Sequence, residues 1–363
     1  MTGKLPYFQT IWMASFTQTG VIAFSLPRLL SENIGTNGWA ALLICSGISM
    51  LNLLLIAIVH RNSQCLSLFE IAQSTFPKFI LVPLFTALVL ILGGLGCMIS
   101  KEYILILQSL TFPVIHTAYL YLVFEFLAFL LILKGILSIS NFVILPLAVT
   151  IAVNVTLITF NAQYLDISRM TTFWFKEADH SFKGCLDIYV AFLGYELCLL
   201  LFPYVNKKTH LMRAYFIGNA ITTFSYILVA LICFSFFSFH QLQHLKYPVL
   251  NLLSYVELPF VKRIDDLVYT LILFRVLITS VLYSWSAVET MKWLLPTSNK
   301  IRWPMLLLGL LALTVLIVLP STLDKLEKWL SIFGYTEVAI AFILPIFLFI
   351  SIMIHKYRGR HYA

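Results

Sequence analysis

Long apolar runs of the chain contain five ionisable residues: Glu102, Glu125, Glu196, Arg275 and Glu337. A charged side chain is costly in hydrocarbon, so residues of this kind are candidates for function. The guanidinium of Arg275 needs an anionic partner or binds a substrate carboxylate, and the sequence does not choose among Glu196, Glu337 and Glu125 as that partner. We otherwise expect Glu125 and Glu337 to be structural or solvated.

Glu196 is the strongest of these candidates because it directly follows Gly194-Tyr195 in the middle of an apolar run. Its carboxylate has three possible roles: it binds a substrate ammonium group, it carries a proton, or it caps backbone amides that an interrupted helix leaves free. Glu102 follows Lys101, so it is either a pocket residue or half of a local ion pair near the outer surface.

Two apolar runs are interrupted by glycine or proline at corresponding positions. The first run carries Gly20 and Pro27, and the sixth carries Gly194 and ends near Pro203. Matching interruptions in two halves of a chain indicate the binding site of an inverted-repeat transporter, because unwound backbone inside a membrane must line a cavity. In the simpler alternative, Gly20 and Pro27 only kink a helix. The site interpretation predicts that Gly20 tolerates alanine poorly and valine not at all.

The composition excludes a soluble enzyme. Hydrophobic residues make up 60% of the 363 residues and charged residues only 11%, whereas soluble domains carry about 25% charged residues. The net charge of +8 comes from single basic residues at the ends of apolar runs. This pattern is typical of an excess of lysine and arginine on the cytoplasmic side of a membrane rather than of nucleic-acid binding. The six cysteines and eight histidines form no metal-binding pattern, and no nucleotide-binding or hydrolase motif is present. We therefore expect no cofactor, no metal and no catalytic residue.

Apolar runs long enough to cross a membrane predict an all-α, polytopic membrane protein with about ten transmembrane helices. The runs span residues 8–30, 38–59, 79–107, 116–134, 142–160, 183–204, 213–238, 263–292, 303–320 and 332–355. We expect one integral membrane domain with a first repeat at about 8–160 and a second at about 183–355. Lysine and arginine in the short loops favour cytoplasmic termini, and an amphipathic stretch at 249–260 is expected to lie along the membrane surface.

Several short motifs follow one another along the whole chain. They are Thr19-Gly20 followed by Leu26-Pro27, Gly38-Trp39, Leu66-Ser67-Leu68-Phe69-Glu70-Ile71, Phe192-Leu193-Gly194-Tyr195-Glu196 leading to Pro203 and Lys207-Lys208, Tyr247-Pro248-Val249-Leu250, and Lys262-Arg263-Ile264-Asp265-Asp266. No single motif is specific. Their order and spacing together resemble the spore germination permeases, the B subunits of nutrient germinant receptors, which belong to the amino acid–polyamine–organocation superfamily.

The resemblance implies a 5+5 inverted-repeat, transporter-like fold in which helices 1 and 6 are broken. It also implies a ligand site between the two breaks, lined further by helices 3 and 8. We expect nine residues to form this site: Thr19, Gly20, Val21, Ile22, Glu102, Gly194, Tyr195, Glu196 and Tyr283.

The implied function is a membrane subunit that senses a small germinant, expected to be an amino acid, in the spore inner membrane. The family assembles with germinant receptor A and C subunits, so these are the expected partners besides the lipid bilayer. A proton-coupled amino-acid permease is the alternative, with Glu196 as the candidate coupling carboxylate. The sequence distinguishes the two functions only through the resemblance.

Two residues depart from the family pattern. Relatives usually have a second glycine where this chain has Ile22. A β-branched residue resists unusual backbone angles, so the unwound stretch is expected to be short. Arg275 lies where relatives are usually apolar, so the resemblance implies no role for it.

Overall fold

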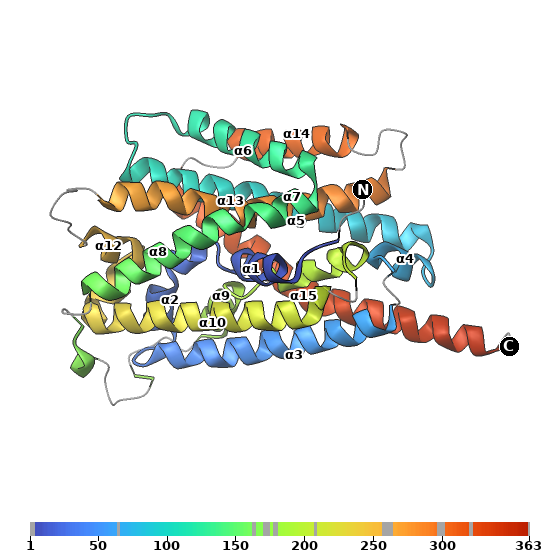
Figure 1. The fold of residues 1–363 in the computed structure, drawn as a ribbon, viewed down its shortest axis with the longest axis horizontal. Coiled ribbons are helices and arrows are strands. Elements are labelled where there is room, and N and C mark those ends of the chain that lie inside the picture. The colour runs from blue at the N-terminus through green and yellow to red at the C-terminus, as the bar shows by residue number, and fades with distance from the viewer. Residues whose placement is uncertain are drawn as a thin grey trace.

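The computed structural model is helical throughout the part of the chain that it describes (Figure 1). The described residues are 4–63, 66–161, 165–169, 175–176, 181–206, 209–255, 264–295, 302–318 and 322–361. The first half contains α1 (Tyr7–Gln18), η1 (Val21–Phe24), α2 (Leu26–Asn33), η2 (Gly38–Ala40), α3 (Ala41–Asn62), α4 (Leu68–Gln73), α5 (Lys78–Leu110), α6 (Thr117–Lys134), α7 (Ile136–Phe142) and α8 (Ile144–Asn161). The second half contains η4 (Ile167–Arg169), α9 (Phe182–Val190), η5 (Tyr195–Tyr204), α10 (Leu211–Phe236), α11 (Phe239–His244), α12 (Pro248–Ser254), α13 (Ile264–Leu294), α14 (Arg302–Val318) and α15 (Leu323–His361).

The helices confirm the predicted transmembrane segments. Eight helical stretches among the described residues are long and apolar enough to cross a membrane, and Arg302–Ile317 forms a shorter apolar helix. The tenth segment is the broken one formed by α1, η1 and α2. The largest difference in boundaries is at the last helix, which starts at Leu323 rather than near residue 332.

Large apolar side chains cover the outward faces of the bundle. Ile44 is 65% exposed, Leu51 67%, Phe126 63% and Ile343 62%. Exposed apolar surface of this extent indicates contact with a hydrophobic environment. Together with the helix lengths, it identifies a multi-pass membrane protein.

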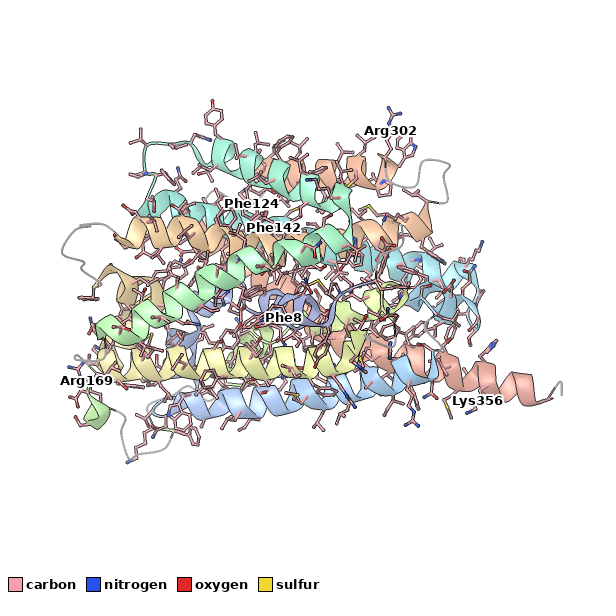
Figure 2. The ribbon with its side chains drawn as sticks, viewed as in Figure 1. Phe8, Phe124, Phe142, Arg169, Arg302 and Lys356 are labelled. Carbon is pink, nitrogen blue, oxygen red and sulfur yellow. The ribbon has the colours of Figure 1, made fainter. Side chains whose placement is uncertain are left out.

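Both chain termini lie at one end of the bundle (Figure 1). Arg302 and Lys356 also lie at this end, whereas Arg169 lies at the opposite end (Figure 2). Two termini on one side of the bundle agree with an even number of crossings, such as the ten that the sequence predicts.

The long helices α5 and α13 form the centre of the bundle, where they pack against each other (Figure 1). Small residues allow this approach, as is common between membrane helices. A Cβ atom on Gly96 of α5 would lie 2.3 Å from the Ser284 hydroxyl of α13 and 3.0 Å from the Ser280 carbonyl oxygen. The pairing brings one face of α5 and one face of α13 towards the broken segment α1–η1–α2, which also contacts both helices.

The amphipathic stretch predicted at 249–260 differs from the expectation. Its first part forms α12, and the apolar residues Val249, Leu250, Leu252 and Leu253 of this helix are buried. The helix packs against η1, α2, α10 and α13. Its apolar face is thus covered by protein rather than lipid, and residues 256–260 lie outside the described residues.

Candidate ligand site at the two helix breaks

The first break is short. α1 ends at Gln18, and only Thr19 (φ −85°, ψ 58°) and Gly20 (φ −75°, ψ −151°) leave the helical conformation before η1 begins. This confirms the short unwound stretch expected from Ile22. The N–H groups of Val21 and Ile22 have no acceptor among the described residues, as is usual at the start of a helix. The break therefore presents two free backbone donors.

The second break is closed by its own residues. α9 ends at Val190, and the chain turns through Gly194 (φ 104°, ψ −16°) into the 3-10 helix η5. Both carboxylate oxygens of Glu196 accept from the Gly194 N–H, at 2.9 and 3.1 Å. Of the three roles open to Glu196, the structure shows the capping contact.

Side chains from α1 and α10 connect the two breaks. The amide nitrogen of Gln18 donates to the Phe192 carbonyl oxygen and to the side-chain oxygen of Asn219, each at 2.8 Å. The Tyr226 hydroxyl lies 3.0 Å from the Gln18 carbonyl oxygen and 2.9 Å from that of Ala191. Hydrogen bonds of Gln18 and Tyr226 thus link the first break to the second.

A cavity of about 210 Å³ lies beside the first break. It is lined by residues of α1, η1, α2, α5, α9, α13 and α15, together with residues of both breaks. These residues are Thr17, Gln18, Gly20, Val21, Ile22, Ser25, Arg28, Leu29, Leu95, Ile99, Glu102, Asp187, Val190, Leu193, Thr279, Tyr283, Glu327, Leu330, Ser331, Gly334 and Glu337. We call it the main cavity.

Five of the nine expected site residues line the main cavity: Gly20, Val21, Ile22, Glu102 and Tyr283. The other four do not. Thr19 lines a second, smaller cavity on the other side of the break, and Glu196 lines a third. Gly194 and Tyr195 line none of these three cavities.

Tyr195 instead belongs to a buried hydrogen-bond network between helices. Its hydroxyl accepts from the Asn52 side chain at 2.8 Å and lies 2.9 Å from the Tyr189 hydroxyl. Gly194 is held by the turn that leads into η5. These two residues therefore stabilise the second break without lining the main cavity.

Two hydrogen-bond acceptors lie at the main cavity without a partner among the described residues. The side-chain oxygen of Gln18 is buried and accepts no hydrogen bond. Its assignment follows from the amide nitrogen, whose two neighbours can only accept. The Glu102 carboxylate also forms no described hydrogen bond or ion pair, while the adjacent Lys101 points away and donates to the Val315 carbonyl oxygen at 2.8 Å. The two residues thus do not form the local ion pair that was the alternative for Glu102.

Glu337 was expected to be structural or solvated, but it lines the main cavity and is only 2% exposed. It accepts a short hydrogen bond from the Tyr283 hydroxyl, and Tyr283 lines the same cavity. Glu337 and Tyr283 therefore join α15 to α13 at the wall of the main cavity.

Sequence reasoning missed the contribution of α15 to the main cavity. Glu327, Leu330 and Ser331 precede the apolar run that begins near residue 332, so they were assigned to a loop. Because α15 begins at Leu323, these residues face the cavity from its first turns. One residue could have indicated that this helix contributes to the cavity. Glu337 is an ionisable residue in the same apolar run, and such residues usually face the interior of a bundle or a cavity.

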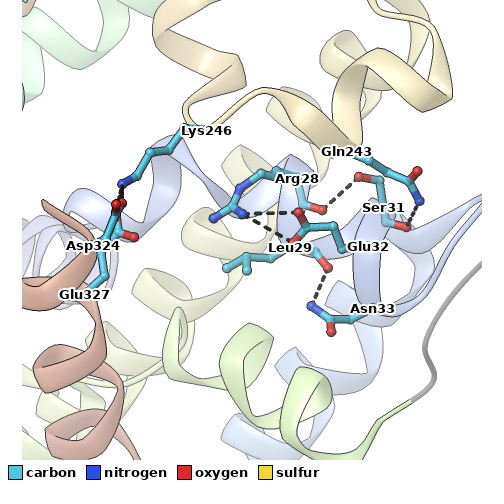
Figure 3. Close-up of polar contacts among 9 residues, drawn as sticks. All are labelled: Arg28, Leu29, Ser31, Glu32, Asn33, Gln243, Lys246, Asp324 and Glu327. Carbon is cyan, nitrogen blue, oxygen red and sulfur yellow. Dashed lines mark hydrogen bonds and ion pairs between the residues drawn. The ribbon is translucent and has the colours of Figure 1, made fainter.

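Two charged residues that line the main cavity, Arg28 and Glu327, form ion pairs (Figure 3). Arg28 of α2 pairs with Glu32 at 3.2 Å, and Lys246 pairs with Asp324 at 2.5 Å and with Glu327 at 3.2 Å. Burial lowers the pKa of Lys246, but the hydrogen bonds and charges of Asp324 and Glu327 outweigh this and raise its pKa above the usual value. The two ion pairs of Lys246 connect the segment between α11 and α12 with the start of α15, whose Glu327 lines the main cavity.

The expectation that Arg275 pairs with Glu196, Glu337 or Glu125 is wrong. Its Nε donates to the Thr19 carbonyl oxygen at 3.0 Å, and it forms no ion pair with a described residue. Glu125 instead accepts a hydrogen bond from the Ser100 hydroxyl. The positive group of Arg275 is thus placed against the end of α1, where backbone carbonyls lack helical partners.

Two solved transporter structures share this fold. An Na⁺-coupled sialic acid symporter aligns with a TM-score of 0.64 at 14% identity, over 96% of this chain and 79% of that one. Mhp1, a nucleobase-cation-symport-1 family transporter, aligns with a TM-score of 0.63 at 11% identity, over 95% of this chain and 79% of that one. These matches confirm the transporter-like inverted-repeat fold with two broken helices.

Curated relatives of similar length are spore germination proteins. Protein B2 of Bacillus subtilis (strain 168) is 25% identical over 98% of this chain and 97% of its own, and protein A2 of the same strain is 23% identical over 97% and 96%. Protein GerQB of Bacillus cereus is 22% identical over 88% and 89%. A family model described as spore germination protein matches residues 4–326. The chain therefore belongs to the spore permease family of spore germination proteins, which are membrane proteins with a transporter fold and not enzymes.

Proposed function

We propose that this protein is the membrane subunit of a germinant receptor that binds a small nutrient, an amino acid, in the main cavity. Family membership supports a role in germination. The cavity volume of about 210 Å³ lies below the range of roughly 300–1,000 Å³ that is usual for drug-sized ligands. A ligand of a few heavy atoms fits this volume better than a peptide or an oligosaccharide does.

The observation that carries the proposal is the pairing of unsatisfied acceptors and donors around one small cavity. Glu102 and the Gln18 side-chain oxygen are acceptors without a described partner, and a ligand ammonium group supplies the missing donors. The N–H groups of Val21 and Ile22 are donors without a described acceptor, and a ligand carboxylate supplies that acceptor. An α-amino acid carries both groups.

In this proposal the remaining expected residues have different roles. Tyr283 forms part of the cavity wall, whereas Thr19, Gly194, Tyr195 and Glu196 hold the two breaks in place. The protein acts in the spore inner membrane with germinant receptor A and C subunits, as the family resemblance implies. Germinant binding moves the linked breaks and thereby signals to these partners.

The replacement Glu102→Gln tests the proposal because it removes the charge and keeps the size of the side chain. A lost charged hydrogen bond of about 1.5–3 kcal/mol raises the germinant concentration needed for a response by roughly ten- to a hundredfold. The measurement is a dose–response curve of germination with a panel of amino acids, on spores with matched amounts of the protein.

Glu125→Gln is the matched control, since Glu125 is also a carboxylate on a transmembrane helix but is buried and does not line the main cavity. Its dose–response curve is expected to stay near that of the wild type. Unshifted curves for Glu102→Gln with every germinant that triggers the wild-type spores would exclude Glu102 from the binding site and contradict the proposal.

The alternative function, a proton-coupled amino-acid permease, is favoured by Glu337, a buried carboxyl group that lines the main cavity. A carboxyl group at this position can exchange a proton when a ligand ammonium approaches. Uptake of labelled amino acid into proteoliposomes that contain this protein alone, driven by a proton gradient, would support the permease. Binding without uptake would support the sensor.

A further inference from the structure

Arg275 lines a second cavity, which lies on the other side of the first break from the main cavity. Thr19 faces this second cavity and the adjacent Gly20 faces the main one. The second cavity has a volume of about 50 Å³, whereas a single water needs about 10–15 Å³. It is therefore too small for an amino acid and large enough for a small inorganic ion.

The positive charge of Arg275 has no compensating carboxylate in the described structure. One of its five N–H donors is used, by the Thr19 carbonyl oxygen. The other four donate to no described residue, and none of the residues that line the second cavity is acidic. An uncompensated charge inside a membrane protein is strongly unfavourable.

Several neutral polar side chains line the same cavity. Ser15, Thr19, Thr150 and Tyr226 form hydrogen bonds with other described residues. Asn154 of α8 and Ser225 of α10 form none, so the amide N–H groups of Asn154 and the hydroxyl of Ser225 are free to donate. Apolar side chains make up most of the remaining lining. A guanidinium, a carboxamide and a hydroxyl from three helices thus line one small cavity.

We infer that the second cavity binds a small monovalent anion of the chloride type, which neutralises Arg275 next to the first break. The site selects against cations because its only charged group is positive. It selects against large anions because of its volume. Since the same guanidinium holds the Thr19 carbonyl, the bound anion fixes Arg275 in the orientation that supports the break.

Binding of radioactive chloride to the purified full-length protein in lipid nanodiscs tests this inference. Ionic strength is kept constant with gluconate, an anion too large for the cavity. We expect saturable chloride binding that bromide displaces, and a melting temperature that rises over the same concentration range. Arg275→Gln is expected to abolish both effects, whereas Arg213→Gln, at an exposed arginine of α10, leaves both unchanged.

Two further variants keep the inference testable if Arg275→Gln does not fold. Ser225→Ala and Asn154→Leu each remove one neutral donor and should weaken chloride binding roughly three- to tenfold, in line with about 0.5–1.5 kcal/mol per neutral hydrogen bond. Formate tests for a carboxylate-specific site, which would bind formate at least as tightly as chloride and would overturn the assignment to chloride-type anions.

Three results would overturn the inference as a whole. They are no saturable chloride binding to the wild type, equal binding to folded Arg275→Gln, and unchanged affinity in both neutral-donor variants. These results test the second cavity alone. The proposal for the main cavity is tested separately by Glu102→Gln, which is expected to leave chloride binding unchanged.

Discussion

The two helix breaks differ in how they use glycine. At the first break Gly20 has a negative φ of −75°, and the next two residues line the main cavity with N–H groups that have no described acceptor. At the second break Gly194 has a φ of +104°, and its N–H is covered by the Glu196 carboxylate. In the proposed function the first break therefore offers its backbone to the ligand, whereas the second is a structural turn.

The space around the two glycines differs in the same direction. A Cβ atom at position 20 would lie 3.4 Å from the Thr279 methyl group, which is an ordinary contact. At position 194 it would lie 2.7 Å from the Thr17 methyl group and 3.1 Å from the Thr17 carbonyl oxygen. Only the second glycine is required by both its conformation and its surroundings. The sequence analysis, in contrast, predicted that Gly20 of the first break tolerates alanine poorly.

The largest effect is therefore expected for Gly194→Ala. A left-handed conformation costs a residue with a Cβ about 1–2 kcal/mol, and the overlap with Thr17 adds about 1–3 kcal/mol. We expect a melting temperature several degrees below the wild-type value and a reduced amount of the protein in spore membranes. A stable Gly194→Ala protein with a wild-type melting temperature would show that the turn is not constrained as described.

A smaller effect is expected for Glu196→Gln. The glutamine side-chain oxygen still accepts from the Gly194 N–H, so the germination dose–response curve should move by less than about threefold. Glu196→Leu leaves the Gly194 N–H buried without an acceptor and should destabilise the protein by about 1–3 kcal/mol. A ten- to hundredfold shift of the curve for Glu196→Gln at matched protein levels would instead place Glu196 in ligand binding.

The fold was predictable because transmembrane helices leave long apolar runs, and two interruptions in such runs stand out. The direction of individual side chains was less predictable. Glu196 reaches back two residues to cap Gly194, and Arg275 pairs with the Thr19 backbone carbonyl. Backbone acceptors of this kind exist only once the helix has broken, so charge pairing by residue type suggested carboxylates for Arg275.

The extent of α15 could not be judged from hydropathy for a related reason. Its first turns carry Asp324, Glu327 and two lysines, which resemble a loop by composition. Their carboxylates are stabilised by ion pairs with Lys246 from a distant part of the chain. The helix therefore continues past the apolar run and supplies one wall of the main cavity.

The smallest effect is expected for Gly20→Ala, contrary to the prediction from sequence. The φ of −75° is available to alanine, and the new methyl group would meet Thr279 at an ordinary contact distance. A compatible Gly→Ala replacement changes stability by no more than about 1 kcal/mol and often increases it, because the unfolded chain loses freedom. The melting temperature should stay within a few degrees of the wild-type value, and the dose–response curve should shift by only a few fold.

Gly20→Val is the contrasting variant, since its additional methyl groups extend beyond the Cβ position towards Thr279 and the main cavity. If Gly20→Ala abolished the germinant response while the protein remained abundant and stable, a Cβ at this position would be obstructing the ligand, and the two breaks would be equally strict in their need for glycine.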